Sequence, residues 1–121
     1  MMSTILLVDD EQNFLKSLAD ALHGYVEGWN VLTAQNGRQG IEVFESQPVN
    51  IIVTDLRMPI MDGIEFLSYV RSKNPRIPVI VMTAGGCADL EERLNSIGAA
   101  WCLRKPFKIT EMVSTISRQL A

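Results

Sequence analysis

The sequence is poor in the residues that build metal clusters and disulfide frameworks: it has two cysteines, Cys87 and Cys102, and one histidine, His23, in 121 residues. The spacing of the two cysteines matches no zinc motif, and a single imidazole excludes a histidine-rich metal site. We therefore expect both cysteines to be buried, reduced thiols, as is usual in the cytosol. The apolar run at residues 5–8 leads directly into Asp9, so it is too short for a signal peptide or a membrane span.

An excess of basic charge is also missing. Eleven Lys and Arg residues against 14 Asp and Glu residues give a net charge of −3, so we expect no direct nucleic acid binding by this domain and no membrane contact. A hydrophobic content of 47% excludes a disordered chain. Because no linker, repeat or low-complexity stretch interrupts the sequence, residues 1–121 are interpreted as a single cytoplasmic domain.

Short apolar runs alternate with amphipathic segments along the whole chain. The expected strands are residues 5–8, 30–34, 51–54, 79–82 and 100–103. Apolar residues at helical spacing follow each strand, including Leu90 after the fourth strand. The ends of the first four expected helices are marked by Gly24, Pro48, Asn74-Pro75 and Gly98. A fifth helix closes the chain and carries one apolar face, formed by Ile109, Met112, Val113, Ile116 and Leu120.

Two of these helices are preceded by typical capping residues. Asn36 and Asp62 each carry a side-chain oxygen that can accept a hydrogen bond from a first-turn amide. Asp62-Gly63 is interpreted as a turn and a cap in which the glycine supplies a positive φ.

Five consecutive βα units predict an α/β fold. Strands that are apolar on both faces need helices on both sides, which is typical of a parallel sheet. We expect a flavodoxin-like, doubly wound (βα)5 sandwich with a five-stranded parallel sheet in the order 2-1-3-4-5. Ligands of such sheets bind at the carboxyl ends of the strands, so the residues at these ends are the candidate functional residues.

The expected strand ends carry three carboxylates, one hydroxyl and one ammonium, which belong to Asp9, Asp10, Asp55, Thr83 and Lys105. Two unit charges about 4 Å apart repel by roughly 4 kcal/mol at an effective dielectric of about 20, so three clustered carboxylates require protonation or a cation. Oxygen ligands favour a hard divalent ion. The sequence therefore predicts a Mg²⁺ site, with Mn²⁺ as the alternative.

A metal, an ammonium and a hydroxyl around an aspartate are also the groups that phosphoryl transfer to that aspartate requires. Asp55 would be the nucleophile, and Lys105 and Thr83 would neutralise charge on the phosphoryl oxygens. No general base is needed, because a carboxylate is already ionised at neutral pH.

Five motifs in this order resemble the response-regulator receiver domain of bacterial two-component signalling. They are Asp9-Asp10, Asp55-Leu56-Arg57-Met58-Pro59, Met61-Asp62-Gly63, Thr83-Ala84 and Lys105-Pro106-Phe107, and they cover nearly the whole chain.

The resemblance implies a role for each matching residue. Asp55 would be the phosphoacceptor, and Asp10, Asp55 and the Arg57 backbone carbonyl would bind Mg²⁺ directly. Asp9 would hold the metal through water. Thr83 and the Ala84 amide would receive the phosphoryl oxygens, Lys105 would pair with the phosphate, and the Lys105-Pro106 bond would be cis.

The resemblance also implies partners. The phosphoryl donor would be a histidine kinase or a phosphotransfer protein, and the surface of the fourth helix, fifth strand and fifth helix is the family's usual contact face for phosphorylation-dependent dimers. Such a domain assists its own phosphorylation and dephosphorylation without being an enzyme for another substrate. A free-standing receiver and a fragment of a longer regulator remain alternatives.

One position departs from the family pattern. Receiver domains typically carry Tyr or Phe three residues before the lysine, where this chain has Cys102. Trp101 should point to the opposite face, because side chains alternate across a strand. Three interpretations remain: a switch without the aromatic relay, a relay through Trp101 after a local distortion, or a domain that is phosphorylated but transmits weakly.

Other functions fit the sequence less well. A metal-dependent phosphatase would need an additional acid or base near Asp55, where Arg57 stands two residues on, and a substrate-covering lid. A nucleotide or flavin binder would need a glycine-rich loop where Asp9 and Asp10 stand. A receiver-like domain used only for protein contacts would be expected to have lost some of the acids or Lys105.

Overall fold

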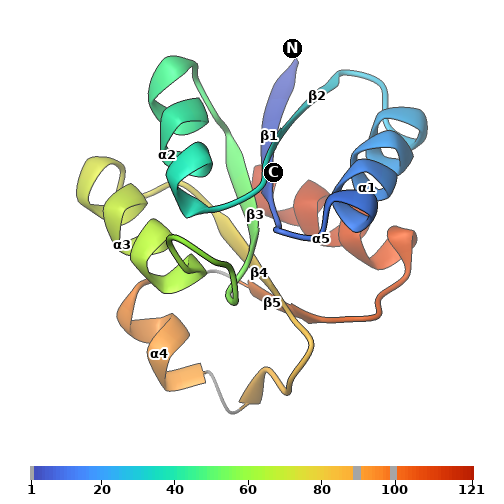
Figure 1. The fold of residues 1–121 in the computed structure, drawn as a ribbon. Helices are drawn as coiled ribbons and strands as arrows, with labels where there is room; N and C mark the ends of the chain where they lie inside the picture. The colour runs from blue at the N-terminus through green and yellow to red at the C-terminus, as the bar shows by residue number, and fades with distance from the viewer. Residues whose placement is uncertain (1, 89–90, 99–100) are drawn as a thin grey trace.

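The computed structural model describes residues 2–88, 91–98 and 101–121 (Figure 1). The strands are β1 (Ser3–Val8), β2 (Trp29–Ala34), β3 (Ile51–Asp55), β4 (Val79–Thr83) and β5 (Trp101–Arg104). The helices are α1 (Gln12–Tyr25), α2 (Gly37–Ser46), α3 (Gly63–Lys73), α4 (Glu91–Ser96) and α5 (Ile109–Leu120). Leu90 and Ala100, which the sequence pattern assigns to the fourth helix and the fifth strand, lie outside the described residues.

The strands form one parallel sheet in the order β2-β1-β3-β4-β5, which confirms the predicted fold class. Figure 1 shows α1 and α5 on one face of the sheet and α2, α3 and α4 on the other. Both faces of the central strands are therefore covered, as their continuous apolar sequences require.

Alternating strand residues divide the interior into two apolar layers. Ile5 and Leu7 of β1 face the layer of α1 and α5, whereas Leu6 and Val8 face the layer of α2, α3 and α4. In β5, Leu103 belongs to the first layer and Cys102 packs against the second. These two layers fix which side of the sheet each strand-end residue occupies.

Some expected boundaries differ from the structure. Asp55 and Thr83 are the last residues of β3 and β4, whereas β1 and β2 begin earlier than expected, at Ser3 and Trp29. The prediction that Gly24 ends the first helix is wrong, because α1 continues to Tyr25. Gly24 has open space around it and stays helical, and the chain leaves the helix at Val26. The glycines with positive φ are Gly28 and Gly98, and Gly98 follows α4 as expected.

The two predicted helix caps are confirmed. The Asn36 side chain accepts a hydrogen bond from the Gln39 amide, and the Asp62 side chain accepts one from the Glu65 amide, both at 2.9 Å. Each cap satisfies an amide that has no partner within its helix.

None of the helices in the described part of the chain has the length and apolar character that crossing a lipid bilayer requires.

Candidate functional site

The sheet register brings the predicted acids together. β1 and β3 are neighbours, with Val8 opposite Thr54, so the next residues, Asp9 and Asp55, lie side by side at the carboxyl edge. Carboxylate oxygens of Asp9, Asp10 and Asp55 all lie within 4.8 Å of one another. The sequence-based prediction that these three acids form one cluster is therefore confirmed.

Asp9 is the buried member of the cluster. Its side chain has no solvent-accessible surface, and each of its oxygens has a hydrogen-bond partner. Oδ1 accepts a hydrogen bond from the Glu11 amide at 2.9 Å, and Oδ2 accepts one from the Lys105 ammonium at 2.7 Å. A buried carboxylate with such partners has a fixed position, so it can hold the neighbouring groups in register.

Lys105 lies between two of the carboxylates. Its Nζ is 2.7 Å from Asp9 Oδ2 and 3.2 Å from Asp55 Oδ2. Burial of the ammonium lowers the pKa of Lys105, but the hydrogen bonds and charges of Asp9 and Asp55 outweigh this effect, and the pKa is raised overall. Lys105 therefore remains a cation throughout the physiological pH range.

Backbone and aromatic contacts also position this lysine. Its amide donates a hydrogen bond to the Thr83 carbonyl at 2.7 Å, which joins the ends of β4 and β5. Its Nζ lies 4.4 Å from the centre of the Phe14 ring, and Phe14 packs edge-on against Phe107 at 6.0 Å. The Lys105-Pro106 bond is cis, as the resemblance implied. Phe14, a residue of α1, therefore adds a cation–π contact to Lys105.

Backbone amides hold one carboxylate oxygen of Asp55, and the side chain is partly exposed to solvent. Its Oδ1 accepts hydrogen bonds from the amides of Leu56 at 2.7 Å and Arg57 at 3.3 Å. Its side chain is 16% exposed, whereas that of Asp9 is fully buried. Asp55 is therefore the more accessible of the two carboxylates that pair with Lys105.

Gly63 allows the loop after Asp55 to close tightly. The expectation of a positive φ at Gly63 is wrong. A Cβ at this position would lie 2.3 Å from the Asp55 carbonyl oxygen and 2.7 Å from Leu56 Cα. Glycine is needed because the start of α3 packs directly against the backbone that carries Asp55.

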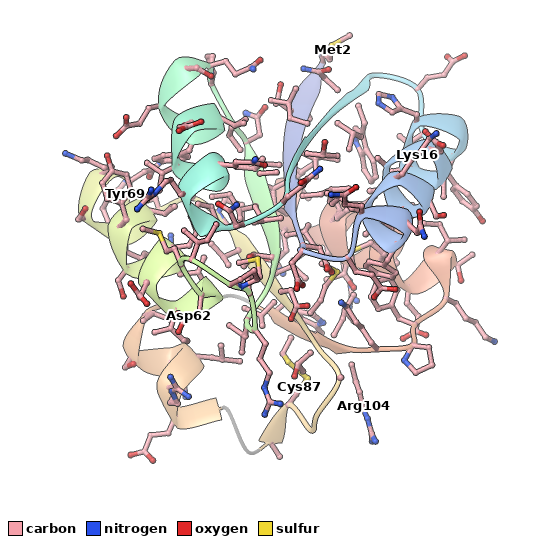
Figure 2. The ribbon with its side chains drawn as sticks, viewed as in Figure 1. Met2, Lys16, Asp62, Tyr69, Cys87 and Arg104 are labelled. Atoms are coloured by element: carbon pink, nitrogen blue, oxygen red, sulfur yellow. A yellow bond between two sulfur atoms is a disulfide. The ribbon has the colours of Figure 1, made fainter. Side chains whose placement is uncertain are left out.

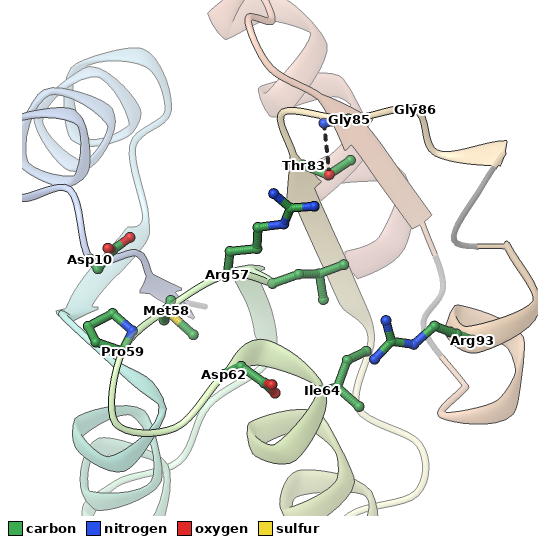
Figure 3. A pocket seen from close by; sticks show the side chains of 11 residues that line it. Asp10, Arg57, Met58, Pro59, Asp62, Ile64, Thr83, Gly85, Gly86 and Arg93 are labelled. Atoms are coloured by element: carbon green, nitrogen blue, oxygen red, sulfur yellow. Dashed lines mark hydrogen bonds between the residues drawn. The ribbon is translucent and has the colours of Figure 1, made fainter.

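The acidic cluster opens into a cleft of about 620 Å³ at the carboxyl edge of the sheet (Figure 3). Asp10 lines one side of the cleft and Thr83, Gly85 and Gly86 line another. Figure 3 shows the side chains of Arg57, from the loop after β3, and Arg93, from α4, directed to this region. Two guanidinium groups thus accompany the acids, and neither side chain was singled out from the sequence.

Thr83 lines the cleft where the loop after β4 begins. The Thr83 hydroxyl oxygen accepts a hydrogen bond from the Gly85 amide at 3.1 Å (Figure 3). Its own proton is therefore available to a ligand in the cleft. Ala84, the next residue, is exposed.

The donor set fits a hard divalent cation. Three carboxylates contribute oxygen ligands at one point, and Asp10 is exposed, so a bound ion would keep open positions for water. One ammonium offsets only part of the charge of three carboxylates. Asp9, Asp10 and Asp55 are therefore the residues that could hold such an ion.

The prediction of two reduced cysteines is wrong. Cys87 and Cys102 form a disulfide, with their Cα atoms 5.9 Å apart (Figure 2). The bond joins the loop that follows β4 to β5 and brings residues separated by 15 positions into contact. No local sequence pattern encodes this path, and the spacing alone gave no signal of it.

Trp101 does not replace the missing aromatic residue. It is 42% exposed, and Arg118 of α5 lies 5.2 Å from its ring centre. Cys102 packs against the opposite layer, so the expected alternation along β5 holds without distortion. In this structure Trp101 therefore lies on the opposite face of β5 from Cys102.

Comparisons with known proteins agree with this geometry. The chain is 35% identical over 117 residues to the transcriptional regulatory protein ZraR of Escherichia coli, a match that covers 97% of this chain and 26% of that protein. It is 36% identical over 112 residues to the probable transcriptional regulatory protein TcrX of Mycobacterium tuberculosis, covering 91% of this chain and 46% of the relative. The chain therefore spans about a quarter to a half of the length of these relatives.

A solved structure and a family model point the same way. The chemotaxis response regulator CheY4 of Vibrio cholerae superposes with a TM-score of 0.90 at 28% identity, and the match covers 99% of this chain and 100% of CheY4. The family model described as response regulator receiver domain matches residues 5–117. The fold, the acidic cluster at its carboxyl edge and this match together show that the chain belongs to the response-regulator receiver domain family.

Proposed function

We propose that this domain accepts a phosphoryl group on Asp55 and relays a signal by rearranging the loop after β4. The observation that carries the proposal is the position of Asp55, which is partly exposed, lies 3.2 Å from the Lys105 ammonium and belongs to a cluster of three carboxylates. An accessible nucleophile beside a fixed cation is the arrangement that phosphoryl transfer requires.

The proposed reaction is a displacement at phosphorus. An Asp55 carboxylate oxygen attacks, the bond between phosphorus and the histidine nitrogen of a kinase or phosphotransfer protein breaks, and an acyl phosphate forms. Lys105 and the hydroxyl of Thr83 stabilise the charge on the phosphoryl oxygens, together with the Ala84 amide.

Asp10, Asp55 and the Arg57 carbonyl would hold Mg²⁺ directly and Asp9 would hold it through water, and the bound ion would supply further positive charge at the phosphoryl group. Asp9 already holds Lys105 on its other side, which supports a positioning role for this acid. Because the cleft also carries Arg57 and Arg93, phosphate-bearing donors meet a region of mixed charge.

The output is proposed to be a change of conformation or association. Phosphorylation adds negative charge and acceptor oxygens next to Thr83 and Lys105, so the loop after β4 is drawn towards Asp55. The exposed Trp101 and the neighbouring Arg118 lie on β5 and α5, which supports homodimerisation through the surface of α4, β5 and α5.

We place the domain in the cytoplasm, where it would act as a phosphoacceptor and not as an enzyme with a separate substrate. The relatives that it matches in part are transcriptional regulators. Any DNA binding would therefore belong to another part of a longer protein.

The direct test is incubation with Mg²⁺ and acetyl phosphate followed by intact-mass measurement. The wild type is expected to gain one phosphoryl group, which hydroxylamine removes because it cleaves acyl phosphates. Asp55→Asn should gain none, and chelation of the metal should abolish the gain in the wild type.

Asp62→Asn is the matched control, because Asp62 lines the same cleft and asparagine caps a helix as well as aspartate does. This variant should be phosphorylated like the wild type. Phosphorylation of Asp55→Asn, or no phosphorylation of the wild type, would contradict the proposal.

A second test concerns Lys105. Lys105→Ala is expected to bind Mg²⁺ but to lose the spectroscopic change that phosphorylation causes, because the phosphoryl group loses its cationic partner. The exposed residue Lys108 provides the control variant Lys108→Ala. An unchanged response in Lys105→Ala would refute the role of this lysine.

A further inference from the structure

We propose that the bond between Cys87 and Cys102 is a redox-controlled tether that restrains the phosphorylation response of the loop after β4 until a dithiol reductant opens it. The inference rests on the proposed function, because the loop it restrains carries groups that would receive the phosphoryl oxygens. The proposal adds a site of thiol–disulfide exchange that is separate from the acidic cluster.

The bond fixes the loop from its far end. Thr83 is held at the near end, because its carbonyl accepts the hydrogen bond of the Lys105 amide at 2.7 Å. Cys87, four residues further on, is joined to Cys102, which lies in β5 opposite Val81 of β4. Ala84, Gly85 and Gly86 therefore span two anchored points, and a displacement towards Asp55 has to be absorbed by these three residues.

The tether is anchored at a strand residue whose side chain packs on one side of the sheet. Cys102 packs against the apolar layer of α2, α3 and α4. A noncovalent side chain at this position can change its rotamer when the loop moves, whereas a disulfide cannot leave without breaking. The bond thus replaces a mobile side chain with a fixed link between the loop and β5.

The domain does not require this disulfide for the stability of its fold. A chain of 121 residues with apolar layers on both faces of its sheet has enough buried surface to fold without a covalent link. In the cytoplasm, where the proposed function places the domain, disulfides are usually transient and catalytic or redox-sensing. Both points favour a bond that opens and closes during function.

Access to the bond is compatible with exchange. Cys87 and Cys102 are both half-buried, and Ala84, Gly85 and Ala88 around Cys87 in the sequence are exposed. An attacking thiolate can therefore approach from the loop side without unfolding of the sheet.

The exchange is balanced with a protein or small-molecule dithiol as the reductant. One of its thiolates attacks a sulfur of the pair, the bond between Cys87 and Cys102 breaks, and a mixed disulfide forms while the other cysteine leaves as a thiolate. The second thiol of the reductant then displaces the remaining cysteine. Two electrons and two protons pass from the dithiol, which becomes a disulfide, and an oxidised dithiol reverses the reaction.

The test compares three forms of the whole chain: the oxidised wild type, the wild type reduced with dithiothreitol, and Cys87→Ser/Cys102→Ser. Thiol titration first establishes the redox state of each form. Intact mass then reports phosphoryl incorporation from acetyl phosphate, and amide hydrogen exchange of residues 84–88 is measured with and without phosphorylation.

We expect faster exchange of these amides in the reduced and double-serine forms even before phosphorylation. Phosphorylation should change their exchange severalfold more in those two forms than in the oxidised form, while phosphoryl incorporation occurs in all three. Dithiothreitol should have no effect on the double-serine variant, which controls for other actions of the reductant.

The outcomes separate the two proposals. Equal loop exchange in oxidised and reduced protein, or cysteines that stay unpaired under oxidising conditions, would overturn the tether. If no form takes up a phosphoryl group, the proposed function fails, and the exchange rates of the unphosphorylated forms still decide whether the bond restrains the loop.

Discussion

Lys105 is the residue on which the electrostatics of the site depend. It pairs with a fully buried carboxylate and with a partly exposed one, and its ammonium also lies over an aromatic ring. These contacts fix the position of the cation, so the proposed transfer of a phosphoryl group to Asp55 would require no reorganisation of Lys105. The same ammonium thus pairs with both Asp9 and Asp55.

Ile60 is a residue with a strained backbone conformation. It has a φ of 70° and its side chain is 71% exposed, in the loop after Asp55. A β-branched residue in this region is strained, so Ile60→Gly should raise the free energy of unfolding by about 1 kcal/mol. Chemical denaturation measures this effect. Ile60→Val keeps the β-branch and should leave stability unchanged, and a less stable glycine variant would contradict the explanation.

Individual site residues differ in how far the sequence could predict them. That Asp9, Asp55 and Lys105 lie together could be predicted, because a parallel sheet gathers strand ends at one edge, whatever their separation in sequence. The reason for Gly63 could not, because a close backbone approach leaves no local pattern. The pairing of Cys87 with Cys102 depends on the path of a loop, which residue spacing does not specify.

At the scale of elements, α4 is fastened by side chains from outside the helix as well as by its own apolar face. Leu94 is buried against the sheet. Arg71 of α3 donates hydrogen bonds to the carbonyls of Ile97 and Gly98 after α4 and to that of Ile77 before β4. Burial of the guanidinium lowers the pKa of Arg71, which nevertheless stays charged at neutral pH.

Replacement of this arginine tests how α4 is held. Arg71→Met keeps much of the side-chain volume but leaves several carbonyls without a donor, so we expect a loss of about 2 kcal/mol in the free energy of unfolding. Hydrogen exchange should show the largest change in and after α4. Arg76→Met, at an exposed position nearby, is the matched control. Equal effects of the two substitutions would exclude a specific role for Arg71.

The order and type of the elements were predictable, because strand runs and helical stripes alternate without interruption. Their exact ends were less so. Glycine at position 24 suggested a helix end, but a glycine stays helical when the surrounding chain continues the hydrogen bonding. The contribution of Arg71 was not predictable either, since it joins segments 26 and 27 residues apart through backbone carbonyls that any residue provides.

For the whole molecule, the disulfide links the loop after β4 to β5. It closes a chain segment with a sequence separation of 15, and a loop of about this length corresponds to roughly 3 kcal/mol of stabilisation in the chain-entropy description. Reduction should therefore lower the midpoint of guanidinium unfolding. The double-serine variant should unfold at the same midpoint with and without reductant, and an unchanged wild-type midpoint after complete reduction would contradict this estimate.

The attachments of α4 have a mechanical consequence. Arg71 holds the chain just after the helix, whereas the disulfide holds the chain before it. Once the bond is open, we expect α4 to rotate about its C-terminal end, which the hydrogen bonds of Arg71 hold in place. A pull on the loop near Thr83 would then swing the first turn of α4 furthest and its last turn least. A partner that distinguishes the two conformations of the domain would therefore be expected to contact the first turn of α4, where the positions of the residues differ most.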